Sequence, residues 1–381
     1  MRPTVPCVGV GGALNRPGLA AIRDIGRGGM RVVGLDRRSA PFGLHSRWSE
    51  AYGVLPGPWS VAAFCDLLRE RRIDVVLPMT SWLVRRLAGE RERIEQVAAL
   101  NLPDLASFEA ADDNGRTCTL CAELGIPAAR LLSSDEIRLP VIVKPRLDIG
   151  GNQGVTLCRR EEDLAGAVER CRDAGGALVQ DYIPGYGDRM RTVVLLFDRD
   201  SRLVAHFTTR KLWTRPYEGG LCTMGISTDE PELVRQVLPF FETLRWRGPA
   251  EAELKIDPRD GVAKVIEINP RFPGYIGHAV DCGLHLPRLA VDVALGRRIQ
   301  PGPYRVGRKY VNAMLHARTI LDRLRRSPHR AATIRQALRD GWDAPWLQFR
   351  GSLDPAGTLA KVLADVTDRR GGRPVRLDMT P

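Results

Sequence analysis

The segment 250–272 constrains the fold more than any other stretch of the chain. Two runs of alternating apolar and charged residues are separated there by Pro258-Arg259-Asp260-Gly261. Alternation with a period of two, interrupted by Asp-Gly, predicts a β-hairpin. On such a hairpin Glu253 lies on one strand, while Glu267 and Asn269 are two residues apart and share one face of the other. We therefore expect these three oxygen-bearing side chains to converge on one patch.

This set of side chains suits a magnesium ion bound beside a nucleotide. Mg²⁺ prefers oxygen ligands and is usually held by one or two carboxylates together with substrate phosphates. Arg271 adds a guanidinium two residues beyond Asn269. The alternative is a hairpin with a solvated, charged face, but nucleotide signals elsewhere in the chain favour a site for Mg²⁺ (or Mn²⁺).

Composition limits the class of protein. The 381 residues suffice for two or three domains, and the hydrophobic content of 44% and charged content of 27% are ordinary for a globular protein. No apolar run is long enough to cross a membrane, and the N-terminus lacks the apolar core of a signal peptide. The eight cysteines are scattered, which favours reduced thiols and a cytoplasmic location. Cys118 and Cys121 have no second pair or nearby histidine, so we interpret them as thiols on a helix.

The net charge of +12 does not indicate a nucleic-acid partner. Only six residues are lysine, and the other basic residues are arginines spread along the chain among acidic residues. They form no stripe with interleaved aromatic residues, which is the usual footprint of a nucleic-acid surface. We therefore expect small-molecule partners, without nucleic acid or membrane. The sequence does not give the oligomeric state.

Residues 1–112 read as an open, parallel α/β domain. The patterns predict strands at 5–10, 30–35 and 73–78 and helices at 17–28 and 81–97. A glycine cluster at the end of the first strand superficially suggests a dinucleotide site. Its spacing is irregular and the third glycine is absent, so we favour a structural βαβ unit.

A second set of motifs follows the capped helix that starts at Asp113-Asn114. Residues 139–145 form a β-branched strand that ends in Lys144, and a glycine-rich turn lies six residues further on, with Gly150, Gly151 and Gly154. A lysine that faces such a turn can bind phosphates together with backbone N–H groups, although an ordinary hairpin turn is the alternative.

Three further segments extend the pattern. Residues 177–185 form a strand and then a hinge whose exposed backbone groups can pair with an adenine edge, and Asp188 beyond it can accept hydrogen bonds from ribose hydroxyls. After a strand at 203–209, the loop 210–216 is a candidate basic clamp on a phosphoryl group, or simply a solvated loop. Trp213, Tyr217 and Tyr275 either line a substrate pocket or pack as ordinary aromatics.

The C-terminal region is predicted to be mainly helical. We expect a helix at 281–294 backing the hairpin, a break at 301–303, and helices at 320–326 and 356–368 joined by 341–353. Arg323, Arg325 and Arg326 read as a solvated basic face.

The order of lysine strand, glycine loop, hinge, basic loop and acidic hairpin ending in Glu267-Ile268-Asn269-Pro270-Arg271 resembles the ATP-grasp superfamily, in the branch of carbamoyl-phosphate-synthase-like carboxylate–amine ligases. The resemblance covers nearly the whole chain. It implies an α/β (α+β) fold in which a pre-ATP-grasp domain (1–112) precedes an ATP-grasp domain (113–300), with a helical segment at 301–381. Within 113–300, a small lid subdomain would span about 135–185 and a larger subdomain about 186–300.

The resemblance also implies roles for single residues. Lys144 would bind the α and β phosphates of ATP, Asn114 stands where the family often has a second lysine, and Arg271 and Lys211 would act on the transferring phosphoryl group. The glycines would form a lid, and Glu253, Glu267 and Asn269 would hold Mg²⁺. Adenine would lie against the hinge residues, which are Gln180, Asp181, Tyr182 and Ile183.

The implied reaction has two steps. ATP would phosphorylate a substrate carboxylate, and an amine would then attack the acyl phosphate and release phosphate. The substrates would be a small carboxylate and an amine, with an amino acid or small peptide expected. The alternatives are a phosphotransferase, a phosphorylation-driven condensation enzyme of a biosynthetic pathway, or an ATP-binding module without activity.

Overall fold

The predicted hairpin forms one edge of the largest sheet in the protein. The computed structural model describes residues 5–39, 45–147, 153–326, 330–341, 354, 356, 358 and 359. Strands β11 (Gly248–Ile256) and β12 (Ala263–Asn269) pair antiparallel, with Glu253 opposite Glu267 and Glu251 opposite Asn269. Since residues that face each other across a ladder share one side of the sheet, all four side chains project to the same side.

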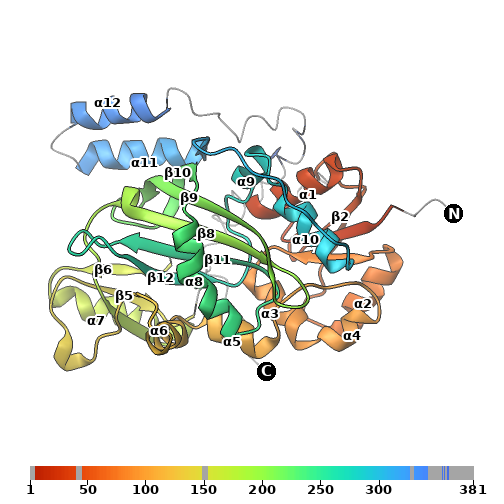
Figure 1. The fold of residues 1–381 in the computed structure, drawn as a ribbon, viewed down its shortest axis with the longest axis horizontal. Helices are drawn as coiled ribbons and strands as arrows, with labels where there is room; N and C mark the ends of the chain where they lie inside the picture. The colour runs from red at the N-terminus through yellow and green to blue at the C-terminus, as the bar shows by residue number, and fades with distance from the viewer. Residues whose placement is uncertain are drawn as a thin grey trace.

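This sheet has six strands in the order β12-β11-β8-β9-β10-β13 (Figure 1). The other four strands are β8 (Met190–Phe197), β9 (Leu203–Arg215), β10 (Leu221–Thr228) and β13 (Lys309–Val311). Helix α8 (Pro231–Thr243) packs on the side of β11 and β12 away from Glu253 through Phe240 and Phe241, and Trp246, which follows the helix, joins the same core.

Residues 210–216 were predicted to form a basic loop, and this prediction is wrong for most of the segment, because β9 continues to Arg215. Its residues pair on both sides, with Arg210 opposite Arg191 of β8 and Lys211 opposite Gly225 of β10. Lys211 and Trp213 alternate into the interior and are each 1% exposed. Pairing to two neighbours therefore outweighs the basic composition that suggested a loop.

A smaller antiparallel sheet lies below the large one (Figure 1). Its order is β6-β5-β7, with β5 (Val141–Pro145) between β6 (Thr156–Cys158) and β7 (Ala177–Asp181). Helix α7 (Glu162–Glu169) covers it through a small core that contains Val141, Val143 and Ala167. The lysine-bearing strand and the strand before the hinge are both confirmed as strands, and they pair with each other.

The N-terminal domain has a parallel sheet in the order β3-β2-β1-β4, which confirms the predicted α/β class. Its strands are β1 (Cys7–Gly11), β2 (Arg31–Asp36), β3 (Ala51–Val54) and β4 (Val75–Pro78). Its helices are α1 (Arg16–Arg27), α2 (Val61–Glu70), α3 (Ser81–Gly89), α4 (Arg91–Glu95) and α5 (Leu105–Asp112). Helix α6 (Asn114–Glu123) follows, with the Asp113 side chain accepting hydrogen bonds from two N–H groups of its first turn.

Two predicted helices are each divided in the structure. The helix expected at 81–97 breaks between α3 and α4, because Gly89 is a weak helix former and Glu90 leaves helical geometry. The helix expected at 281–294 is α9 (Gly277–Asp281) followed by α10 (Leu286–Ala294). Gly283 adopts a left-handed φ of 96° between them, and Pro287 suits the first turn of a new helix.

Helix α10 was also expected to back the hairpin, and this is wrong. It packs against α1 and β4, in a core that the first domain shares with β8 and β9. Helices α11 (Ala313–Arg326) and α12 (Arg330–Gly341) lie beside β9 and β10 (Figure 1). The helix expected at 356–368 and the connection at 341–353 fall almost wholly outside the described residues. None of the described helices is long and apolar enough to cross a membrane.

Candidate functional site

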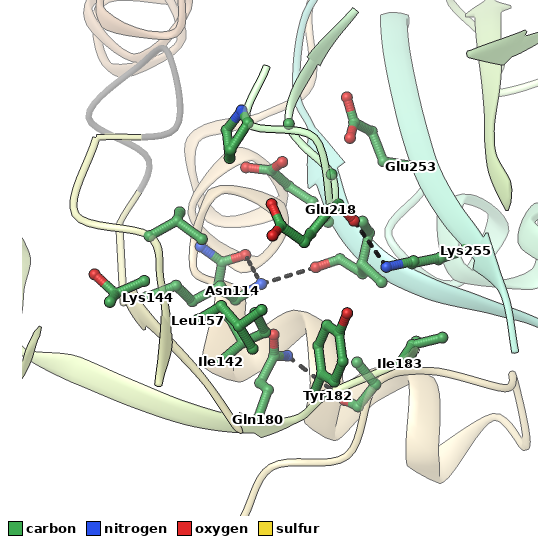
Figure 2. A pocket seen from close by; sticks show the side chains of 18 of the residues that line it. Asn114, Ile142, Lys144, Leu157, Gln180, Tyr182, Ile183, Glu218, Glu253 and Lys255 are labelled. Carbon is green, nitrogen blue, oxygen red and sulfur yellow. Dashed lines mark hydrogen bonds between the residues drawn. The ribbon is translucent and has the colours of Figure 1, made fainter. Parts of the chain in front are cut away.

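A cavity of about 410 Å³ opens between the small sheet and the large sheet. This volume is in the range of about 300–1,000 Å³ that small-molecule sites occupy. Figure 2 shows side chains from β5, β7 and the hinge facing those from β11 across this space. Seven of the residues predicted for the site line it: Lys144, Gln180, Asp181, Tyr182, Ile183, Glu253 and Glu267.

The remaining predicted residues lie elsewhere or are not described. Gly150 and Gly151 fall outside the described residues. Gly154 has a left-handed φ of 77° and packs against Pro145, while its neighbours Gln153 and Val155 line the cavity. The predicted residues that do not line the cavity are Gly154, Asp188, Lys211, Asn269 and Arg271.

Lys144 ends β5 and is held by two acceptors from other elements. Its Nζ donates to Asn114 Oδ1 and to the backbone oxygen of Ile266, each at 2.8 Å (Figure 2). Asn114 in turn donates from Nδ2 to the backbone oxygen of Pro145 at 3.2 Å. Asn114 therefore fixes the position of Lys144.

Glu253 lines the cavity and forms an ion pair with the buried Lys211. Its Oε2 lies 2.8 Å from Lys211 Nζ, which also donates to the backbone oxygen of Gly220 at 3.0 Å. Burial disfavours the charged form of Lys211, but the neighbouring acidic groups Glu253, Cys222 and Glu251 together outweigh this effect, and the pKa of the lysine is raised. Lys211 therefore carries its charge into a buried site beside a carboxylate.

Three charged residues that line the cavity were missed by sequence reasoning, namely Arg159, Glu218 and Lys255. Lys255 lines the cavity, and its Nζ donates to the backbone oxygens of Gly185 and Glu218, both at 2.9 Å. Burial, opposed by Glu218 and Asp188, lowers the pKa of Lys255 to about 8. Lys255 follows Glu253 by two residues on β11, so the same alternation could have identified it as a residue of the site.

Within the hinge, Tyr182 faces the cavity, whereas the side chains of Gln180 and Asp181 bind other residues of the protein. The side chain of Tyr182 lines the cavity, and Lys255 Nζ lies 5.2 Å from the centre of its ring. Gln180 donates from Nε2 to Cys118 Sγ at 2.9 Å, and Asp181 accepts from Arg259 at 2.9 Å. The side chains of Gln180 and Asp181 are therefore anchored to the protein.

The predicted ribose contact is placed differently. Asp188 lies in the short 3-10 helix Gly187–Arg189 and does not line the cavity, whereas Glu218 does (Figure 2). Glu218 belongs to the connection between β9 and β10, where Pro216, Gly219 and Gly220 also line the cavity. No sequence pattern singled out this carboxylate.

The segment that contains Asn269 and Arg271 connects the hairpin to the N-terminal domain. Asn269 donates from Nδ2 to Glu251 Oε2 at 3.2 Å, and Arg271 donates from Nε to Ser81 Oγ at 3.1 Å. Glu251 was not predicted, although it stands two residues before Glu253. Burial and the charge of Glu253 raise the pKa of Glu251 to about 7.

The described residues contain no group of three His, Cys, Asp or Glu side chains arranged to hold a metal ion. Glu253 and Glu267, which are paired across the ladder, supply two carboxylates, and Asn269 follows on the same side of the sheet. Mg²⁺ commonly takes only one or two protein carboxylates and completes its shell with phosphate oxygens and water. The chemistry of this donor set fits such an ion.

The three aromatic residues considered for a substrate pocket do not line the cavity. Trp213 donates from Nε1 to Asp340 of α12 at 2.9 Å, and Tyr275 hydrogen-bonds to Glu251. The Arg323 guanidinium lies 4.5 Å from the Trp213 ring and 4.0 Å from the Tyr217 ring. The prediction of a solvated face is therefore wrong for Arg323, which joins α11 to the connection that lines the cavity.

Comparisons with known proteins were made on sequence and on structure, and no family model matches the chain. A D-aspartate ligase of Enterococcus faecium (strain Aus0004) is 28% identical over 273 residues, which are 63% of this chain and 65% of that protein. The matched region thus spans slightly less than two thirds of the length of this curated relative.

Three solved structures illustrate the structural similarity. The biotin carboxylase–βγ-ATP complex of Campylobacter jejuni has a TM-score of 0.63 at 16% identity, over 80% of this chain and 74% of that one. The N5-carboxyaminoimidazole synthetase of Staphylococcus aureus with ADP has a TM-score of 0.63 at 14% identity, over 80% of each chain. The L-amino acid ligase of Bacillus licheniformis has a TM-score of 0.58 at 18% identity, over 81% of this chain and 79% of that one.

Proposed function

From the premise that this chain has the ATP-grasp fold, we propose that it is an ATP-dependent carboxylate–amine ligase. The observation that carries the proposal is a single cavity lined by Lys144 from the small sheet and by Glu253 and Glu267 from the large sheet. A cation and two carboxylates that face one nucleotide-sized space are the parts that phosphoryl transfer requires.

The cavity provides a place for each part of ATP. Adenine would pack against Tyr182 and Ile183 at the hinge, and Glu218, which faces the space, would accept hydrogen bonds from ribose in place of Asp188. Lys144 would bind the α and β phosphates, since its position is already fixed by Asn114. A preorganised cation loses little freedom when the phosphates bind.

A divalent cation would be held by Glu253, Glu267 and the carbonyl oxygen of Asn269. When bound, Mg²⁺ would neutralise negative charge on the phosphates during phosphoryl transfer. Manganese can take the same oxygen ligands, so we expect either ion to bind. Glu253 would then contact both Lys211 and the bound metal ion.

The chain's own residues would act by position and charge. In the first step a substrate carboxylate oxygen attacks the γ-phosphorus and ADP leaves. In the second an amine attacks the acyl carbon and phosphate leaves with that oxygen. Lys211, which pairs with the cavity residue Glu253, and Arg271, which follows the hairpin two residues after Asn269, would bind the negative charge that develops on the phosphoryl group. Gln153 and Val155, at the described end of the glycine loop, would help to exclude water.

The named relatives suggest an amino acid as the substrate that is activated. One relative is a D-aspartate ligase and one structural neighbour is an L-amino acid ligase. We therefore propose D-aspartate as the first carboxylate to test, with a small amine or a peptide amine as the acceptor.

The test is release of ADP from the purified full chain with ATP and Mg²⁺. D-aspartate, L-aspartate and a panel of other amino acids are supplied as carboxylates, with and without added amines and peptides. The proposal expects ADP release that requires both a carboxylate and an amine. Amine-independent formation of a stable phosphorylated product would instead identify a phosphotransferase, and a complete metabolite extract that yields no ADP would indicate a binding module.

The cysteines support a cytoplasmic location as part of this proposal. All eight are free thiols, and seven of them are buried. Reduced cysteines are typical of proteins in a reducing compartment.

Replacing Arg323 with Ala is expected to weaken ATP binding by about two- to thirtyfold, because stacked guanidinium contacts contribute about 0.5–2 kcal/mol. Arg323 holds Tyr217, whose backbone oxygen accepts from Gly187 N at 3.1 Å, and both flank segments that line the cavity. The Kd for ATP, measured by calorimetry, tests this expectation. Arg325→Ala, an exposed arginine on the same helix, is the matched control, and equal effects of the two substitutions would contradict the role of Arg323.

A further inference from the structure

Glu251 is a buried carboxylate immediately behind the proposed metal ligands. It is 2% exposed and lies on β11, directly opposite Asn269 and two residues before Glu253. Burying a carboxylate is costly unless hydrogen bonds satisfy its oxygens. Its partners should therefore reveal why a carboxylate stands at this position.

Both oxygens of Glu251 are engaged, each by a different residue. Oε2 accepts from Asn269 Nδ2 at 3.2 Å. Oε1 accepts from the hydroxyl of Tyr275, whose oxygen also lies 2.6 Å from Thr192 Oγ1. Thr192 and Tyr275 are themselves buried, so the group is a closed polar cluster beneath the site.

The contact with Asn269 fixes the direction of its amide. Nδ2 is the amide atom that faces Glu251, and an ionised carboxylate can only accept hydrogen bonds, so ionised Glu251 holds the NH₂ end of the asparagine toward itself. The carbonyl oxygen is on the other side of the amide carbon and must therefore point away from Glu251. An unconstrained asparagine could present either end to a cation, and only the oxygen end binds one.

We infer that Glu251 is a positioning residue that holds the carbonyl oxygen of Asn269 in the orientation needed to bind the divalent cation. The inference rests on the proposed function, since it assigns Glu251 to the same site. Hydrogen-bonding partners of this kind orient metal ligands in many proteins, and their loss typically lowers metal affinity by about 10–100-fold. Tyr275 contacts only the other oxygen of Glu251 and should affect the metal much less.

The experiment measures Mn²⁺ affinity by electron paramagnetic resonance, in the presence of a non-hydrolysable ATP analogue. Glu251→Met, which has a similar volume but cannot accept from the amide, is expected to weaken Mn²⁺ binding by about 10–100-fold. Glu251→Gln keeps one oxygen acceptor and should restore most of the affinity. The affinity of the analogue without metal should be unchanged in both variants, which a merely structural role of Glu251 does not predict.

Tyr275→Phe is the matched control, because it removes the other hydrogen bond to Glu251. Combining it with Glu251→Met removes the buried hydroxyl that would otherwise face the methionine, so the double variant provides the test if Glu251→Met fails to fold. Tight Mn²⁺ binding in the wild type and equally tight binding in Glu251→Met and in the double variant would overturn this inference alone. If the wild type binds no Mn²⁺ with the analogue, the proposed function fails as well.

Discussion

Glu267→Gln is expected to lower kcat by at least about 100-fold, because it removes a carboxylate that would bind the metal ion at the transferring phosphate. Glu267 lines the cavity opposite Glu253 on the hairpin. The substitution preserves the shape of the side chain and should leave folding intact. Steady-state ADP release, measured with the substrate pair found in the screen, gives kcat directly.

The control for this prediction is Glu242→Gln, which makes the same change at an exposed position on α8. It should alter neither kcat nor the thermal unfolding temperature. If Glu267→Gln abolished the cooperative thermal transition, its loss of activity would reflect unfolding, and the assignment of a metal ligand would lose its support.

Lys144→Met is expected to lower kcat/KM for ATP by about 100- to 1,000-fold, as for the loss of other preorganised groups that bind developing charge. Its Nζ is the cationic group at the end of β5, and it is held at 2.8 Å from two acceptors. Methionine keeps most of the apolar stem and removes the charge. Titration calorimetry with ADP separates loss of nucleotide affinity from loss of turnover.

Lys264→Met provides the matched comparison. Lys264 pairs with Asp257 and Asp260 near the hairpin turn and does not line the cavity. The substitution should therefore leave the ATP kinetics nearly unchanged. Comparable losses in the two variants would mean that general charge, rather than the position of Lys144, controls nucleotide binding.

The local patterns of the sequence predicted the framework of the site well. Alternation and an Asp-Gly turn predicted the hairpin and the shared face of Glu253, Glu267 and Asn269, whereas the register shift after Glu253 that sets it opposite Glu267 could not be deduced from the pattern. The resemblance to the ATP-grasp superfamily is confirmed at the level of the fold. The domain limits at residues 112 and 300 stay predictions, as do the roles of the individual site residues.

Features that depend on contacts between distant segments were not predictable. The extension of β9 to Arg215 needs two neighbouring strands, and the contacts of Arg323 with the rings of Trp213 and Tyr217 need a helix that is about 100 residues away in the sequence. Glu218 lies on a connection without a motif. Glu251 differs from these cases, because the alternation that marked Glu253 also applied to it.

The central claim is that the cavity activates a carboxylate by phosphorylation, and transfer of ¹⁸O tests it most directly. The carboxylate identified in the ADP-release screen is supplied with both oxygens labelled, and the released phosphate is analysed by mass spectrometry. The account predicts one ¹⁸O atom in each phosphate formed together with an amide bond. Unlabelled phosphate, or label found in AMP instead, would contradict it.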